Sequence, residues 1–282
     1  MVVDRKVRPS RAARRSSPPG NWRLALAAAS SRTGAILSDG LRLGYRHGFD
    51  SGPFMTHIYA NRALGRTPLG RHLDRRLLDR PTCEAFRDIR ALAQTLLGEA
   101  LDAHPGEEPV VADLAAGPAP QLVAALHERP GARGLACDVD PAALKQARAR
   151  ACAYGVEDRV RFVWSDAFDR EALGALEPRP DIVLELGLYG IYRDDALIER
   201  HFHDLAELVA PGQVVFNVQT QNPEIDFIAR TWRDRHGEPC AWRLRSLETL
   251  LGYAGAAGYE PRSVTADRHG IYRVVRLGRR ER

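Results

Sequence analysis

The sequence predicts an α/β protein with a doubly wound, mainly parallel sheet of seven strands and an N-terminal helical cap. Two observations predict this fold. Apolar strand-like runs alternate with helical segments from about residue 108 onward, and small or acidic residues follow the strand-like runs. Alternation of this kind is typical of a parallel sheet with helices on both faces. We therefore expect a disordered basic leader at residues 1–20, a helical cap that forms the substrate region at 21–107, and a ligand-binding domain at 108–282.

The strands and helices of the main domain are placed by the period of their apolar residues. Buried strand-like runs are expected at residues 109–114, 134–138, 159–164, 181–186 and 213–219. Helices are expected at residues 121–128, 141–153, 195–209, 224–235 and 246–257. Two further strand-like runs close the chain, and we expect them to form an antiparallel pair at the edge of the sheet, at residues 259–265 and 270–277.

The segment before residue 108 has a helical pattern. Apolar residues recur at three- and four-residue spacing in 71–78 and 82–101, and shorter helical elements are expected at 22–29 and 35–45. Residues 44–75 are instead a dense mix of glycine, aromatic and polar residues, unlike a plain amphipathic helix. We expect this segment to cover a substrate pocket.

The basic residues are concentrated at the start of the chain. Six of the 41 Lys and Arg residues and one of the 36 Asp and Glu residues lie in residues 1–20. The remaining chain is therefore balanced, although the whole chain has a net charge of +5. A nucleic-acid-binding body is expected to carry a basic excess. We expect no nucleic-acid partner, and a leader too polar to fold by itself.

Cysteine spacing and hydropathy bear on the location of the protein. The four cysteines lie far apart and form no Cys-x-x-Cys pair, at positions Cys83, Cys137, Cys152 and Cys240. This spacing predicts neither a metal site nor a disulfide framework. No run approaches the roughly 18 apolar residues of a membrane span, and the stretch after Arg14-Arg15 is too short for an export signal. We expect a cytoplasmic protein.

The loop after the first strand is the first candidate ligand site. Asp113 ends the strand and is followed by small residues that include Ala115 and Gly117. Small residues let the chain turn tightly and let a ligand approach the backbone, next to a helix N-terminus. Many α/β proteins have such a loop, so the loop by itself does not identify a ligand.

An acid also ends the second strand. Asp138 occupies the position from which doubly wound proteins hydrogen-bond the ribose of a nucleotide. Asp140 fits a second role, because it precedes Pro141 and can cap the following helix. We therefore expect Asp138 and the adjacent Val139 to contact a ribose.

The third and fourth strands end in further polar residues. Asp166 can accept a hydrogen bond from an adenine amino group, with Ala167 and Phe168 beside the ring, although for this position alone a turn-forming Asp is the commoner case. Glu185 ends the fourth strand, at the rim where open sheets bind ligands.

Together these strand ends resemble the class I S-adenosylmethionine-dependent methyltransferases, over roughly residues 85–277. The resemblance implies a Rossmann-like fold and S-adenosylmethionine as the cofactor. It also implies that the first loop wraps the methionine part, that Asp138 holds the ribose, and that Asp166 reads the adenine. The first loop departs from the family pattern, because only Gly117 remains of its usual two or three glycines.

The N-terminal motifs resemble a narrower bacterial family of methyltransferases, some of which are fused to an α/β-hydrolase domain. The motifs are Gly-Phe-Asp-Ser-Gly at 48–52, Tyr59, Asn61, Gly-Arg-Thr-Pro-Leu-Gly-Arg at 65–71, and Asp-Arg at 74–75. This resemblance extends over about residues 40–277 and links the two parts of the chain.

Several functions fit the pattern, and a small-molecule methyltransferase fits it best. A nicotinamide dehydrogenase is disfavoured because the Gly-x-Gly-x-x-Gly loop is absent. A methyltransferase of nucleic-acid bases usually has Asn/Asp-Pro-Pro-aromatic after the fourth strand, whereas Asn222-Pro223 here follows the fifth. A nucleic-acid or protein methyltransferase and a non-catalytic S-adenosylmethionine-binding protein remain the alternatives.

Methyl transfer requires aligned reactants and exclusion of water, and it requires a general base only if the acceptor must lose a proton. The catalytic candidates are Tyr189, His201 and His57. The expected substrate contacts are Phe54, Tyr59, Asn61 and Tyr192. Each of these residues also has a plainer interpretation as a packing, capping or solvent-exposed residue.

Overall fold

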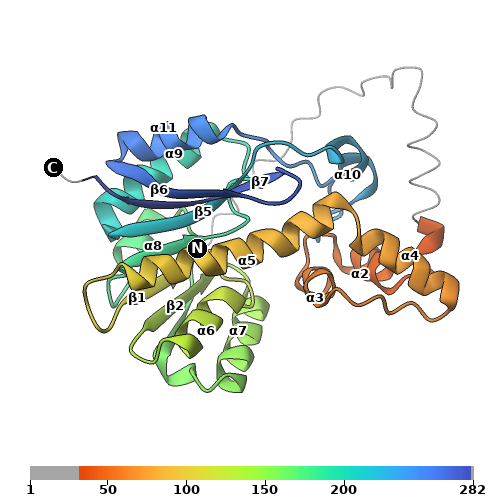
Figure 1. Cartoon of the computed structure of the whole chain (residues 1–282), viewed down its shortest axis with the longest axis horizontal. Coiled ribbons are helices and arrows are strands. Elements are labelled where there is room, and N and C mark those ends of the chain that lie inside the picture. The colour runs from red at the N-terminus through yellow and green to blue at the C-terminus, as the bar shows by residue number, and fades with distance from the viewer. Residues whose placement is uncertain (1–31, 281–282) are drawn as a thin grey trace.

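A computed structural model describes residues 32–280. A seven-stranded sheet in the order β3-β2-β1-β4-β5-β7-β6 forms the main body (Figure 1). The strands are β1 (Val110–Asp113), β2 (Arg133–Asp138), β3 (Val160–Trp164), β4 (Ile182–Glu185), β5 (Gln213–Gln219), β6 (Tyr259–Ala266) and β7 (Tyr272–Arg279). The sheet is mainly parallel, because six of these strands run in the same direction and β7 runs antiparallel to them. The predicted fold class is confirmed.

The last two strands form the expected antiparallel pair at the edge of the sheet. Within the pair, β7 lies between β5 and β6, and β6 is the edge strand. Side chains of β7 are buried along most of its length, whereas β6 is largely exposed beyond Tyr259. The reason is compositional, since β7 supplies apolar residues to both faces and β6 carries polar residues suited to an edge.

Helices cover both faces of the sheet. One face packs against α5 (Pro81–Asp102), α6 (Pro120–Glu128) and α7 (Pro141–Ala153), and the other against α8 (Arg170–Gly174), α9 (Asp195–Asp204) and α11 (Leu247–Ala256). Successive residues of a strand face opposite sides. On β5, accordingly, Val215 joins the buried cluster on the α5 side, and Val214 and Phe216 join the cluster on the α9 side.

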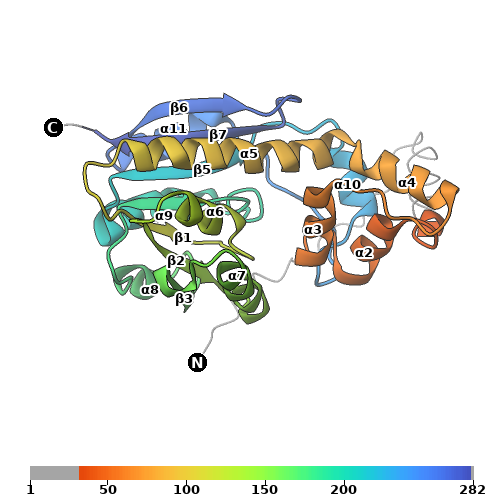
Figure 2. The ribbon, with the colours of Figure 1, turned by 60° about the horizontal axis from the view of Figure 1, so that its bottom comes forward.

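A helical lobe stands beyond the end of the sheet, on the right of Figure 1. It consists of α2 (Asp39–His47), α3 (Gly52–Ala60), α4 (Pro68–Leu78), the start of α5, and α10 (Ile225–Thr231). Aromatic packing joins α10 to the N-terminal helices, with the rings of Phe49 and Trp232 stacked 4.7 Å apart. The single long helix α5 runs from this lobe across the sheet (Figure 2), so the lobe and the sheet share one continuous element.

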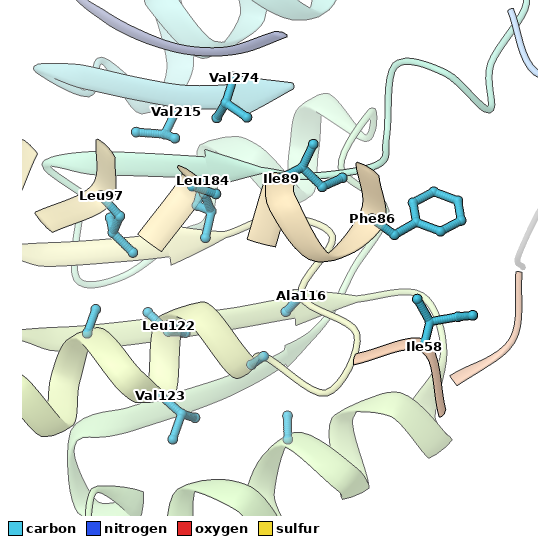
Figure 3. Packing of buried hydrophobic residues seen from close by; sticks show 14 of the residues in the cluster. Ile58, Phe86, Ile89, Leu97, Ala116, Leu122, Val123, Leu184, Val215 and Val274 are labelled. Carbon is cyan, nitrogen blue, oxygen red and sulfur yellow. The ribbon is translucent and has the colours of Figure 1, made fainter. Parts of the chain in front are cut away.

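The lobe lies at the carboxyl ends of the parallel strands. Arg235, which follows α10, bonds to Asp50 through its backbone amide (2.7 Å) and approaches Asp140 after β2 through its guanidinium (3.5 Å). Ile58 of α3 belongs to the same buried cluster as Ala116, in the loop after β1, and Ile89 of α5 (Figure 3). The predicted cap segment 44–75 is therefore near the edge where open sheets bind ligands.

Most predicted helices are present, with four differences. The sequence did not predict α3 or α8, because α8 is short and the helical spacing of α3 is obscured by glycine and proline at its start. The helix expected at 195–209 is α9 continued by the π-helix η2 (Leu205–Val209), and a 3₁₀ turn, η1 (Glu157–Arg159), precedes β3. The leader and the helix expected at 22–29 lie outside the described residues.

No helix within residues 32–280 has the length and hydrophobicity to cross a membrane.

Candidate functional site

The loop after β1 and the acid at the end of β2 are in direct contact. The Gly117 amide donates a 2.7 Å hydrogen bond to Oδ2 of Asp138, and the Asp140 amide donates a 2.8 Å bond to Oδ1 of the same carboxylate. Asp140 also caps α7 by accepting from the Ala142 amide. Both roles that the sequence offered for this pair of acids are therefore compatible in space.

The first loop adopts a glycine-like conformation with few glycines. Gly117 and Ala119 both have positive φ, at 53° and 48°. This left-handed conformation costs an alanine roughly 1–2 kcal/mol relative to a right-handed one. Ala119 is fully buried against the core, so packing holds the strained residue in place. Two of its residues thus have the left-handed conformation, although only one of them is a glycine.

Asp113 is a buried carboxyl group at the end of β1. Burial raises its pKa to about 8, the charges of Asp138 and Glu185 add to the shift, and a hydrogen bond from the Ala115 amide opposes it. At neutral pH this group is therefore largely protonated. Asp138 and Glu185 act on it because β2 and β4 are the two neighbours of β1 in the sheet, so the three acids lie at adjacent strand ends.

The end of β3 presents the predicted adenine-binding residues together with an aromatic residue that the sequence argument missed. The carboxylate of Asp166 is exposed and accepts from the Phe168 amide at 2.9 Å, while Ala167 between them is buried. Trp164 donates its indole N–H to the carbonyl of Val139 at 3.0 Å. The side chains of Trp164 and Val139 are both largely exposed. Only their positions mark them in the sequence, since Trp164 ends β3 and Val139 directly follows β2.

A buried polar cluster lies behind the end of β4. Glu185 accepts hydrogen bonds from the hydroxyl of Tyr189 and from Nε2 of His201, and all three side chains are almost completely buried. Burial, followed by the charge of Glu185, raises the pKa of Tyr189 well above its ordinary value. Among the described residues Nδ1 of His201 has no hydrogen-bond partner. The structure therefore brings two of the three predicted catalytic residues together on one carboxylate.

His57, the third catalytic candidate, belongs to a different cluster inside the helical lobe. Its Nε2 lies 3.0 Å from Oδ2 of Asp74, which also accepts from Ser38, Gly40 and Leu64. Burial opposes ionisation of Asp74, but the bonds from His57, Ser38 and the two backbone amides outweigh it and hold its pKa at about 2. This cluster connects the start of α2 to α3, α4 and the chain before α4.

The predicted substrate contacts have different surroundings. Phe54 is fully buried against Phe49 and Trp232. Asn61 is exposed, ends α3 in a left-handed conformation and bonds to Arg75. The centroid of the Tyr59 ring lies 5.0 Å from the guanidinium carbon of Arg90. Burial raises the pKa of Tyr59 to about 12. Tyr192 packs edge-on against Phe168, with ring centroids 4.6 Å apart. The structure thus groups Tyr192 with the predicted adenine site rather than with the lobe residues.

A surface hollow of about 370 Å³ lies at the opposite edge of the sheet. It is lined by residues at the start of β5 and the end of β7, namely Gly212, Gln213, Arg276, Gly278 and Arg279, together with Ala103 and Arg262. No predicted site residue lines it, and parallel sheets bind ligands at their carboxyl ends. In the part of the chain that the structure describes, no group of three His, Cys, Asp or Glu side chains could hold a metal ion.

Fold and strand-end residues together define a Rossmann-like domain of the methyltransferase class. The chain belongs to the family described as "Putative methyltransferase", whose profile matches residues 3–280.

The chain is also similar to a curated protein of unassigned activity. The uncharacterized protein YnbC of Escherichia coli K12 is 29% identical over 249 residues, which cover 86% of this chain and 43% of YnbC. The chain therefore spans less than half the length of this curated relative.

Solved structures show the same fold at low sequence identity. A possible exported protein from Bordetella parapertussis has a TM-score of 0.71 at 18% identity, over 93% of both chains. Magnesium protoporphyrin IX methyltransferase from Synechocystis PCC 6803, with bound S-adenosylhomocysteine, has a TM-score of 0.56 at 14% identity, over 82% of this chain and 95% of that one.

Proposed function

We propose that the chain transfers the methyl group of S-adenosylmethionine to a small-molecule acceptor. The observation that carries the proposal is the bond between the Gly117 amide and Asp138, with Asp166 at the next strand end. A backbone amide and two carboxylates are thereby gathered at adjoining strand ends, as recognition of an adenosine requires.

The residues at this edge have the chemistry that the cofactor needs. When bound, S-adenosylmethionine supplies a methyl group activated by a sulfonium centre. Asp138, oriented by two backbone amides, can accept hydrogen bonds from ribose hydroxyls, with Val139 beside it. Asp166, Ala167 and Phe168 would hold the adenine. The first loop, through Asp113, Ala115 and Gly117, would hold the methionine part.

The cluster around Glu185 supports the acceptor side of the proposal. Tyr189 stays protonated because its pKa is raised, so it serves as a hydrogen-bond donor to Glu185 and not as a base. If His201 donates through Nε2 to Glu185, its Nδ1 is free to accept a proton. We propose His201 as the general base for an acceptor that must lose one. His57 is given no step, because Asp74 already occupies its Nε2.

Charge and packing support a small uncharged or weakly charged acceptor over a nucleic acid. Outside residues 1–20 the chain has as many acidic as basic residues, and the helical lobe stands at the carboxyl edge where it would restrict access by a large polymer.

A cytoplasmic location is also part of the proposal. It rests on the wide spacing of the cysteines, and fractionation of cells that express the full chain tests it.

Calorimetric titration tests the cofactor assignment. S-adenosylhomocysteine should bind saturably with one site per chain, whereas NAD should not bind. Incubation with S-adenosylmethionine and a small-molecule metabolite extract should then yield S-adenosylhomocysteine, with RNA and denatured protein as parallel acceptors. Absence of binding would contradict the proposal, and binding without turnover on any acceptor fraction would favour the non-catalytic alternative.

A further inference from the structure

Tyr192 has neighbours that the sequence argument did not anticipate. The loop between β4 and α9 brings its ring to 4.6 Å from the ring of Phe168, at an interplanar angle of 63°. The side chain is partly buried, and its pKa is raised by burial and then by the charges of Asp166 and Asp138. The phenol therefore lies close to both acids assigned to the adenosine, on the side of the sheet that α9 covers.

Arg245 holds this loop at several points. Its guanidinium donates to the carbonyl oxygens of Tyr189 and Tyr192, the latter at 2.8 Å, and its Nε donates to Oδ1 of Asp195 at 2.7 Å. Asp195 is the first residue of α9. The guanidinium thus connects two points of the loop to the helix that follows it.

The backbone of Arg245 is fixed as well. Its amide donates to the carbonyl of Gln219, the last residue of β5, at 3.1 Å. The side chain is only 3% exposed, so its charge is satisfied by these oxygens and not by water. The planar fork of an arginine can serve three oxygens at fixed angles, which a lysine cannot do. Arg245 is therefore suited to set the position of the loop, because it is buried and bonded to the loop, to α9 and to the end of β5.

We propose that Tyr192 is part of the nucleoside-binding site, as the aromatic partner of the adenosine opposite Asp138 and Asp166, and that Arg245 is the positioning residue that keeps it there. This inference rests on the proposed function. It replaces the acceptor contact expected for Tyr192 with a cofactor contact. It also explains why an arginine is buried beneath a surface loop.

Two ligands locate the effect without knowledge of the acceptor. S-adenosylhomocysteine carries the whole cofactor skeleton, whereas 5′-methylthioadenosine carries the nucleoside without the amino-acid part. In calorimetric titrations, Tyr192→Ala and Arg245→Met should each weaken both ligands by about tenfold, the scale of losing one aromatic contact to a base. Tyr192→Phe, which retains the ring, should stay within about threefold of the wild-type affinity.

Controls separate positioning from general destabilisation. Arg243→Met removes another partner of Asp195 at an exposed position, and it should leave both affinities unchanged. Arg245→Lys should recover part of the lost affinity. Because Arg245 is proposed to act through Tyr192, the double variant Tyr192→Ala/Arg245→Met should bind no more weakly than the weaker single variant, which is the non-additivity expected of coupled residues.

The outcomes are distinguishable. If Asp138→Ala weakens binding but folded Tyr192→Ala and Arg245→Met variants keep the wild-type affinity, the inference is wrong and the proposed function stands. If Arg245→Met lowers the melting temperature but leaves both affinities unchanged, Arg245 has a purely structural role. That result would also overturn the inference. If the wild-type chain binds neither ligand, the proposed function fails and the inference fails with it.

Discussion

The backbone amide of Gly117 lies 2.7 Å from Oδ2 of Asp138, so the loop after β1 and the acid at the end of β2 form one unit. The second oxygen of Asp138 is held by the Asp140 amide. A carboxylate oriented in this way needs little reorganisation when it binds a diol, because both its oxygens already have fixed directions. The contact also makes the conformation of the first loop dependent on the acid.

The first prediction concerns this acid. Asp138→Ala should weaken binding of S-adenosylhomocysteine by roughly 1–3 kcal/mol, because the ribose hydroxyls and the Gly117 amide lose a common partner. Isothermal calorimetry measures the change. Asp158→Asn is the matched control, since Asp158 is exposed in η1. Equal affinities for wild type and a folded Asp138→Ala variant would remove Asp138 from the site.

The second prediction concerns the pH dependence of stability. The pKa of Asp113 rises from 3.8 to about 8 in the fold, so the folded state binds more protons than the unfolded state between these values. The contribution of Asp113 to stability is therefore greatest below about pH 4 and is lost as pH rises through 8.

Asp113→Asn removes this titration. The test is urea unfolding of the cofactor-free protein. The free energy of unfolding of the variant minus that of wild type should increase as pH rises from 5 to 8.5, because only wild type loses the contribution of Asp113. The increase should be at most about 1.4 kcal/mol per pH unit, the value for one proton. Asp158→Asn should show no such trend. A difference that stays constant with pH would mean that Asp113 has an ordinary pKa.

The fold was largely predictable because strand and helix periods are local properties of the sequence. The positions of β1 to β5 and of α5 to α7 follow from runs of buried residues. The place of β7 was not predictable in the same way, since strand order depends on which strand has two apolar faces to bury. Helix α3 was missed because Ser51 and Pro53 give the start of a helix the composition of a loop.

Candidate site residues could be proposed from the sequence where they stand at strand ends, but not where side chains meet across the fold. Asp113 and Asp138 end β1 and β2, and Asp166 follows β3, so a recognisable strand marks each position. The contact of Tyr192 with Phe168 and the bonds of Arg245 join segments that are 24 and more than 50 residues apart. No local pattern marks such pairs. The contact of His57 with Asp74 is another example, since the two residues lie on different helices.

The third prediction tests the structural role of that pair. Asp74→Asn should lower the free energy of unfolding at pH 7 by roughly 2–4 kcal/mol, because a buried carboxylate that accepts three hydrogen bonds and pairs with His57 is replaced by a group that also presents donors. The pKa of Asp74 is lowered in the fold to about 2. Its stabilising effect is therefore present above about pH 4 and is lost as pH falls toward 2.

Urea unfolding at pH 7 and pH 3 measures both parts of this prediction. The deficit of Asp74→Asn should be smaller at pH 3 than at pH 7. Asp79→Asn is the control, because Asp79 is an exposed carboxylate that pairs with Arg75 at 2.9 Å, and exposed pairs contribute little. A deficit that is negligible at pH 7, or larger at pH 3, would show that Asp74 does not hold the lobe together as a carboxylate.

The last prediction concerns the loop that keeps a glycine-like shape without the glycine. Ala119 has φ 48° and ψ 45°, and its side chain is fully buried. Ala119→Gly relieves a strain of roughly 1–2 kcal/mol, but it loses about 0.8 kcal/mol from one buried methyl group and about 0.4–1 kcal/mol through the freer unfolded chain. These effects nearly cancel, so Ala119→Gly should change stability by less than about 1 kcal/mol and should leave the affinity for S-adenosylhomocysteine intact.

Ala119→Val should be strongly destabilising, because a β-branched residue at positive φ is a rare outlier. Urea unfolding of the three proteins decides the matter, and similar stabilities for the valine and glycine variants would mean that residue 119 does not have the left-handed conformation in solution.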